Sequence, residues 1–153
     1  MSSFIGEYSC KMDDKGRVPL PATFRAALGN NAAIHLVAKK DEYLDCLAVM
    51  TEPEWERRIA IIDQELNLYD KEDQILRDAL HRNKASFDLD NIGRILIPKK
   101  LCEKANISKE IVFVGAGNEI KLWAKDIYDK TVLSDDDFAA RLQKRLGNKK
   151  KDE

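Results

Sequence analysis

The chain has 153 residues and a mass of 17.5 kDa, which is enough for one ordinary domain or two very small ones. Hydrophobic residues make up 44% and charged residues 35%, a balance that excludes disorder throughout, and no run approaches the ~18 apolar residues of a membrane helix. The net charge of -1 excludes the large positive excess of a simple nucleic-acid binder, and the N-terminal residues lack a signal-peptide pattern, so we expect a cytoplasmic protein.

The first third of the chain predicts short strands around one short helix. Apolar and polar residues alternate from Tyr8 to Met12, as in a half-buried strand, and Gly16 supplies a turn that needs positive φ. The expected elements are a strand at 8–12, a turn at 14–16, a strand at 18–20, a helix from Pro21 to Gly29 and Asn30, and strands at 34–38 and 47–50 with a charged loop at 39–42.

The middle of the chain has a helical texture. Four apolar residues recur at i, i+4, i+7 and i+11, which predicts one face of an amphipathic helix opened by Pro53. A second helix follows the charged break at 70–73. We expect the stripe to be core or subunit interface rather than a ligand site; it consists of Trp55, Ile59, Ile62 and Leu66.

The last part predicts a second set of the same elements and then a helix. Strands are expected at 86–89, 94–97, 111–114 and 119–123, with a short helix at 98–105. Ser134 can cap a final helix that has three aspartates in its first turn and basic residues in later turns. Residues 147–153 contain three lysines and no apolar residue, so we expect a frayed tail there.

The chain repeats itself once. Residues 13–21 align with residues 90–98, keeping Asp, Gly, Arg and Pro, and the offset of 77 also relates 34–37 to 111–114. The offset then falls to 73, which places four extra residues near 39–45 in the first half. Each half is too small to bury a core alone, so we expect the halves to pack across a pseudo-twofold as one barrel-like body. The predicted divisions are a first domain at 5–52, a helical connector at 53–80, a second domain at 81–124, a C-terminal helical region at 125–146 and a flexible basic tail at 147–153.

With these paired motifs, the sequence resembles the MraZ family of bacterial transcriptional regulators, which have tandem SpoVT-AbrB (AbrB-like) domains. The resemblance rests on residues 6–8, the DxxxR motifs at 13–17 and 90–94, and the stretches 21–25 and 93–98. It implies an α+β, mainly β fold in which two swapped-hairpin halves form one pseudo-twofold barrel with flanking helices. It also implies an octamer-like ring of identical subunits, associated with the nucleoid, that binds double-stranded DNA at direct repeats upstream of its own division and cell-wall gene cluster.

The resemblance implies that Arg17 and Lys15 are the main DNA contacts. Arginine can donate two hydrogen bonds to guanine, whereas lysine acts as a point charge near phosphate. Lys11 and Arg25 are weaker candidates for phosphate contacts. In the second motif Ile92 and Cys102 replace Lys15 and Arg25, so we assign DNA contact mainly to the first motif. For Arg94 the alternative is a structural role. The structural motif residues are Asp13, Gly16, Asp90 and Gly93.

The near-neutral charge then requires multivalency. Several subunits that each present one small basic tip combine through effective concentration, and no globally basic surface is needed. The alternative is an oligomeric scaffold or protein-interaction module that shares the fold and does not bind DNA, with the Asp–Arg pairs as simple ion pairs across turns.

We expect no enzyme, cofactor, metal site, small-molecule substrate or membrane partner. The chain has no GxSxG, HExxH or phosphate-binding Gly-rich motif, and its three cysteines lack a paired CxxC. His35 and His81 have no second ligand at metal spacing, and the aspartates at 135–137 suit a helix N-terminus.

Overall fold

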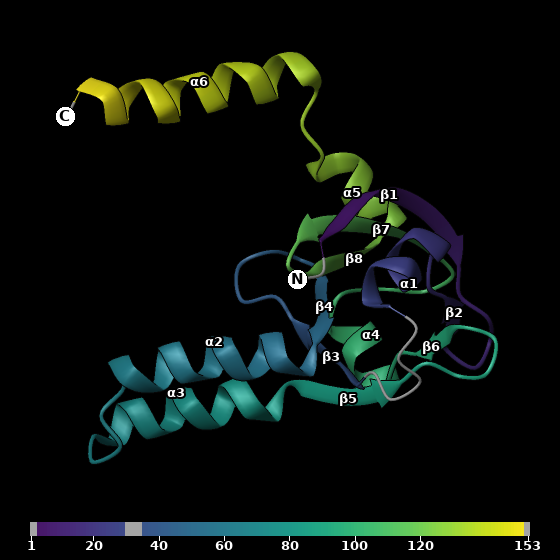
Figure 1. Ribbon diagram of the computed structural model, residues 1–153, viewed down its shortest axis with the longest axis horizontal. Coiled ribbons are helices and arrows are strands. Elements are labelled where there is room, and N and C mark those ends of the chain that lie inside the picture. Colours follow the sequence, from purple (N-terminus) through teal and green to yellow (C-terminus); the bar gives the residue numbers. More distant parts are fainter. Residues whose placement is uncertain (1–2, 30–34, 152–153) are drawn as a thin grey trace.

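The computed structural model describes residues 3–29 and 35–151. It is an α+β structure with a large antiparallel sheet, a separate two-stranded ribbon and several helices (Figure 1). In chain order the elements are β1 (Phe4–Lys11), β2 (Arg17–Pro19), α1 (Ala22–Leu28), β3 (His35–Lys40), β4 (Leu47–Thr51), α2 (Glu52–Glu65), α3 (Lys71–Arg82), β5 (Lys84–Asp88), β6 (Arg94–Leu96), α4 (Lys99–Lys104), β7 (Glu110–Gly117), β8 (Ile120–Ala124), α5 (Lys125–Thr131) and α6 (Asp135–Lys151).

The two halves of the chain are joined by strand pairing. The sheet has the order β1-β7-β8-β4-β3-β5, and β2 pairs with β6. The repeat relates β1 to β5, β3 to β7 and β4 to β8, so the order reads the same from either edge. The first strand of each half therefore pairs with a strand of the other half, and β4 meets β8 at the junction. Neither half has a complete sheet of its own.

The expected closed barrel is not found. The edge strands β1 and β5 do not pair with each other in the described ranges, so the sheet stays open. The ribbon and the short helices complete the core instead. Val18 of β2, Phe24 of α1, Ile95 of β6 and Leu101 of α4 are all buried in one cluster with the apolar residues of the sheet. In Figure 1, α1, α4 and the ribbon lie to the right of β4.

Phe24 is the centre of this core. Its ring is fully buried and meets the rings of Tyr8, Phe4 and Phe113 edge-on, with centroids 5.2, 5.8 and 6.3 Å away. Edge-to-face contacts at such distances are favourable beyond the area they bury. Because Tyr8 and Phe4 belong to β1 and Phe113 to β7, this one side chain connects α1 to strands from both halves.

The predicted connector helices form a hairpin. Thr51 caps α2 by accepting a hydrogen bond from the Glu54 N–H at 3.4 Å, and Asp70 caps α3 through the Asp73 N–H at 3.0 Å. Trp55 packs with Val37, Ala48 and Met50 on a second, smaller core. The hairpin extends from the sheet, on the left in Figure 1.

The last helix is longer than expected. Ser134 accepts a hydrogen bond from the Asp137 N–H at 3.2 Å, as predicted for a cap. However, α6 continues to Lys151, where the sequence predicted a frayed tail from residue 147. Lysine is a good helix former, which offsets the cost of Gly147 in the helix. In Figure 1, α6 extends away from the rest of the molecule.

No helix in the described ranges combines the length and the apolar composition needed to cross a membrane.

Candidate nucleic-acid interface

The first DxxxR motif is a tight turn organised by one carboxylate. Asp13 Oδ1 accepts hydrogen bonds from the backbone N–H groups of Lys15 and Arg17, both at 2.9 Å, and its Oδ2 accepts from Arg17 Nε at 2.7 Å. The Gly16 N–H donates to the Asp13 carbonyl at 3.1 Å, and Gly16 has a φ of 84°. The local sequence therefore folds into a loop that holds the Arg17 guanidinium in place.

The second motif repeats this geometry. Asp90 Oδ1 accepts from the N–H groups of Ile92 at 3.0 Å and Arg94 at 2.8 Å, and Oδ2 accepts from Arg94 Nε at 2.7 Å. Gly93 has a φ of 81°. The structural motif residues predicted from the sequence thus occupy equivalent positions in two matching turns.

The two turns are joined by reciprocal hydrogen bonds. The Leu20 N–H donates to the Gly93 carbonyl at 3.0 Å, and the Ile97 N–H donates to the Gly16 carbonyl at 2.9 Å. Between them, β2 and β6 pair antiparallel, with Arg17 opposite Leu96 and Pro19 opposite Arg94. The turns therefore flank a single ribbon.

Both motif arginines project from the outer face of this ribbon. Val18 and Ile95 are fully buried, and side chains alternate along a strand, so the residues on either side of each point outward. The side chains of Arg17 and Arg94 are 34% and 30% exposed. A two-stranded ribbon of this kind can enter the major groove of DNA.

The Arg17 guanidinium is oriented and still has donors to offer. Its Nε is bound by Asp13, and its two terminal nitrogens have no hydrogen-bond partner among the described residues. A held guanidinium with two free donor nitrogens suits the O6 and N7 acceptors of guanine, which accept a pair of hydrogen bonds. Arg94 has the same arrangement, with its Nε on Asp90.

The electrostatics of the turns depend on the ionised aspartates. The pKa of Asp13 is lowered, first by the Arg17 backbone N–H and then by the Arg17 side chain and the Lys15 N–H. The pKa of Asp90 is lowered in the same way by Arg94 and Ile92. Each carboxylate stays charged at neutral pH and keeps its arginine in position.

The two turns differ in charge. Residues 11–17 hold three cations and two anions, whereas residues 88–94 hold one cation and two anions. Lys15 is exposed at the first turn, and its counterpart in the second turn is Ile92, which is 64% exposed. The first turn is therefore the better match for a phosphate backbone.

The two weaker candidates for phosphate contacts, Lys11 and Arg25, lie at different turns. Lys11 is exposed at the end of β1, just before the first turn. Arg25 lies on α1, but its side chain reaches the second turn, where a Cβ on Gly93 would collide with the Arg25 guanidinium. The structure thus places a second cation, besides Arg94, at the second turn.

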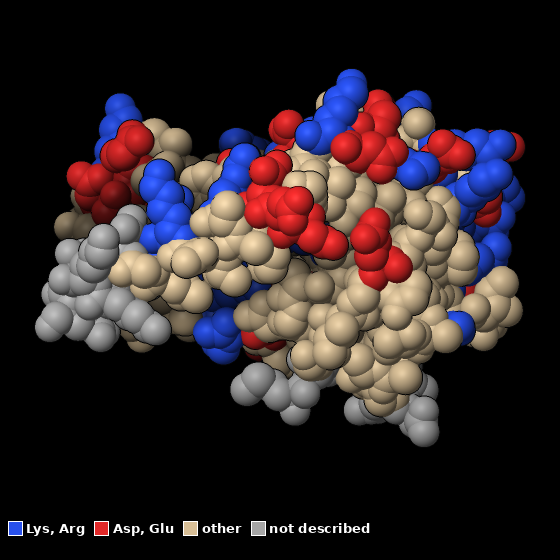
Figure 2. Space-filling model, turned by 90° about the horizontal axis from the view of Figure 1, so that it is seen from above, with Lys and Arg blue, Asp and Glu red and all other residues tan. Residues whose placement is uncertain are grey.

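Sequence reasoning missed two exposed lysines near the first turn. Lys99 and Lys100 begin α4, two and three residues after Ile97, whose N–H is bound to Gly16. The internal repeat did not indicate these lysines, because the equivalent residues of the first half are the uncharged Ala22 and Thr23. Figure 2 shows Lys and Arg side chains gathered at the right-hand end of the molecule, the end at which the ribbon lies in Figure 1.

The two histidines and the aspartates at 135–137, none of which we expected to bind a metal, each have a structural interaction. His35 Nδ1 lies 2.5 Å from Asp88 Oδ1, across the β3–β5 pair. The His81 ring meets Trp55 edge-on at 5.9 Å. The three aspartates at 135–137 lie in the first turn of α6, where carboxylates interact favourably with the helix dipole.

Comparison with known proteins matches nearly the whole chain. The family model described as "MraZ protein, putative antitoxin-like" matches residues 3–78 and 80–149. Proteins named "Transcriptional regulator MraZ" are similar throughout. The one from Phocaeicola vulgatus is 33% identical over 144 residues, covering 94% of each chain. The one from Cytophaga hutchinsonii is 32% identical over 153 residues, covering 99% of this chain and all of its own. The one from Flavobacterium psychrophilum is 33% identical over 159 residues, covering 100% of this chain and 98% of its own.

Proposed function

The chain belongs to the MraZ family, and we propose that it is a sequence-specific DNA-binding transcriptional regulator that reads DNA with the β2–β6 ribbon. The observation that carries the proposal is the pair of matching turns, each of which holds an arginine Nε on its aspartate and leaves the terminal guanidinium nitrogens without a hydrogen-bond partner among the described residues. The regulator names of the relatives support the same function.

The first turn is the main reading head in this proposal. Arg17 contacts base edges, Lys15 contacts an adjacent phosphate, and Lys11 adds positive charge at the base of the turn. Lys99 and Lys100 extend the basic surface beside it. Arg94, helped by Arg25, makes a weaker contact, because the second turn has fewer cations.

The proposal includes an assembly and a target. Identical subunits form an octamer-like ring in which each subunit has the swapped-hairpin fold, and the ring binds direct repeats upstream of the protein's own division and cell-wall gene cluster. The exchange of strands between the two halves supports the swapped-hairpin description. A protein of this kind acts in the cytoplasm at the nucleoid, and the regulator names of its relatives support a role without catalysis.

A fluorescence-anisotropy titration tests the proposal. The protein is titrated against DNA from upstream of its own gene and against a scrambled duplex, at two salt concentrations. Arg17→Ala should weaken binding to the specific duplex by about 10- to 100-fold, the worth of one paired arginine–guanine contact. Specific binding should also fall steeply with salt, because bound phosphates release counterions.

Arg94→Ala is the matched control, because its turn has the same geometry and fewer cations. We expect a smaller loss from Arg94→Ala than from Arg17→Ala. Equal binding to both duplexes, or no binding by a folded protein, would contradict the proposal and favour the scaffold function.

A further inference from the structure

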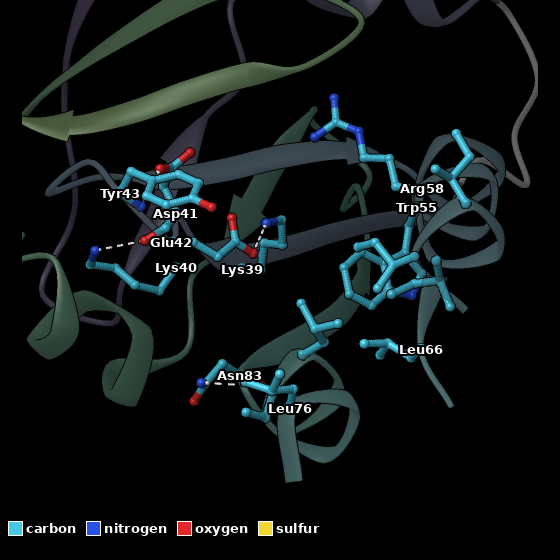
Figure 3. Close-up of a pocket in the computed structure, with 15 residues that line it drawn as sticks. Lys39, Lys40, Asp41, Glu42, Tyr43, Trp55, Arg58, Leu66, Leu76 and Asn83 are labelled. Carbon is cyan, nitrogen blue, oxygen red and sulfur yellow. Dashed lines mark hydrogen bonds and ion pairs between the residues drawn. The ribbon is translucent and has the colours of Figure 1, made fainter. Parts of the chain in front are cut away.

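The strongest unexplained feature of the molecule is a groove between the connector helices. A cavity of about 800 Å³ lies between α2, α3 and the segment from Lys39 to Tyr43 (Figure 3). Its walls are mostly apolar, with Ile59 and Ile62 on α2, Leu66 directly after α2, and Leu76 and Leu80 on α3. Leu76 is 46% exposed and Ile61 is 51% exposed. The DNA-binding proposal does not use this groove.

A second apolar surface lies on α6. Phe138, Leu142 and Leu146 follow one another at intervals of four residues, so they form a stripe along one face of the helix. They are 54%, 43% and 53% exposed, and every residue from 135 to 146 is exposed. A helix with such a stripe gains stability in water by burying it against another surface.

The two surfaces have complementary charges. Residues 141–145 of α6 carry three cations and no anion, and residues 135–137 carry three carboxylates. At the tip of the α2–α3 hairpin, residues 65–73 carry four carboxylates and one lysine. At the other end of the groove, Asp41 and Glu42 are paired with Lys121 and Lys39, and Lys40 donates to backbone carbonyls. The same end has Arg82, the last residue of α3.

Charge therefore sets one direction for the helix in the groove. The basic part of α6 lies at the acidic hairpin tip, and the acidic first turn lies near Lys40 and Arg82. The two lengths also agree. Residues 135–146, which include the whole stripe, span about 18 Å of helix, as do the 12 residues of α3.

We propose that α6 of one subunit docks its Phe138–Leu142–Leu146 stripe into the α2–α3 groove of a second copy of the chain. Such a contact joins two different surfaces, so each subunit gives a helix to one neighbour and receives a helix from the other. Contacts of this head-to-tail type close into rings when the rotation between subunits permits. The inference rests on the ring assembly in the proposed function and names the surfaces that form it.

Two single substitutions and their mixture test the docking. Leu142→Asp places a charge in the stripe and leaves the groove intact, whereas Leu76→Asp places a charge in the groove and leaves α6 intact. Light scattering after size-exclusion chromatography measures the molar mass. The wild type should have a mass several times 17.5 kDa, and each variant alone should be a monomer.

The mixture of the two variants supplies the decisive result. The intact α6 of the Leu76→Asp chain can enter the intact groove of the Leu142→Asp chain, so the 1:1 mixture should give a dimer of about 35 kDa, twice the mass of one chain. Ala140→Asp is the matched control, because residue 140 is exposed on the opposite face of α6. This variant should keep the mass of the wild type.

The outcomes separate this inference from the function. If Leu142→Asp and Leu76→Asp keep the wild-type mass, the docking is wrong while the ring stands. If the wild type is itself a monomer, both the docking and the ring are wrong. If the variants are monomers but their mixture forms no dimer, the head-to-tail contact is wrong. The Arg17→Ala titration reports on DNA binding independently of all three results.

Discussion

At the scale of single residues, two glycines decide how the turns meet. Gly16 and Gly93 both have positive φ, which L side chains rarely adopt, and the carbonyl of each accepts a hydrogen bond from the opposite half. A Cβ on Gly16 would lie 3.0 Å from the Ile97 carbonyl oxygen. These positions require glycine for backbone conformation and for space.

Gly16→Ala should therefore lower the free energy of unfolding by about 1–3 kcal/mol, because it combines strain at positive φ with a tight backbone contact. Gly29→Ala is the matched control. Gly29 has the same φ of 84°, but no atom of the described residues lies within 4 Å of its added Cβ. Urea unfolding followed by tryptophan fluorescence measures both. An equal loss in the two variants would show that the contact with Ile97 has no effect.

At the scale of elements, a chain of charged groups connects α2 to β8 and to the loop before β4. Arg58 of α2 binds Glu54 at 3.0 Å and Glu119 at 2.6 Å. Lys121 of β8 binds Glu119 at 2.9 Å and also binds Asp41. All five side chains are at most 24% exposed. Positive and negative groups alternate in this network, so each charge has an opposite charge beside it. The network therefore holds one side of the α2–α3 groove in place.

Hydrogen bonds within this network and from the adjacent Arg57 lower the pKa of two of its carboxyls. Arg57 donates two hydrogen bonds to Glu54 and, despite some desolvation and with help from Arg58, lowers its pKa to about 2. Burial alone would raise the pKa of Asp41, but Lys121 and the N–H groups of Leu44 and Tyr43 outweigh it and lower the pKa to about 2. Both carboxylates are therefore more acidic in the folded chain than in the unfolded chain.

Folding stability should consequently fall in acid. The unfolded pKa values are about 3.9 for Asp and 4.3 for Glu, so this stabilisation is complete above about pH 5 and is lost as the pH falls toward about 2. Lys121→Met should lower the free energy of unfolding at pH 7 by about 1–3 kcal/mol, because it leaves two part-buried carboxylates without their ammonium partner. Its stability should also fall less steeply between pH 5 and pH 3. Urea unfolding at pH 7, 5 and 3 measures both effects.

Lys125→Met is the control for this variant. Lys125 binds Asp129 at 3.3 Å in a pair that is 43% and 57% exposed, and exposed pairs contribute at most about 1 kcal/mol. If the two variants have the same stability at every pH, the network does not stabilise the fold.

At the scale of the whole molecule, the near-neutral charge and the small basic turns make DNA binding depend on assembly. The first turn of a single subunit has three cations and two anions, so its net positive charge is small and it should bind DNA weakly alone. Several such turns fixed on one ring act at high effective concentration on DNA that holds several copies of the target sequence. The free energy of binding then comes from the number of turns engaged.

A duplex with three correctly spaced repeats should therefore bind the wild type about 10²- to 10⁴-fold more tightly than a duplex with one repeat. A duplex in which the spacing changes by about half a helical turn (~5 base pairs) should lose most of this gain, because alternate sites then face opposite sides of the DNA. Anisotropy titrations at fixed salt compare the three duplexes. If affinity does not change with repeat number, each subunit binds alone and the ring contributes nothing.

The features that could be predicted from the sequence are those that depend on residues close together in the chain. The two turns, their glycines, the short helices after Pro21 and Pro98 and the amphipathic connector all follow from hydrogen bonds and periodicities that span a few residues. The structure has these elements close to their predicted positions. The repeat offset of 77 also predicted correctly that the two turns would share one geometry.

The way in which the two halves combine depends on contacts between residues that are distant in the sequence. The contact of Arg25 with the second turn, the place of Lys99 beside the first turn and the pairing of Asp41 with Lys121 join residues about 70 to 80 positions apart. The open sheet depends on pairs of β1 with β7, about 100 positions apart, and of β3 with β5, about 50 positions apart. Such contacts depend on which strands pair across the halves, and local propensity carries no information about that choice. Bringing distant residues together costs conformational entropy, and burial of the shared core around Phe24 offsets this cost. The packing of that core then determines which charged side chains meet.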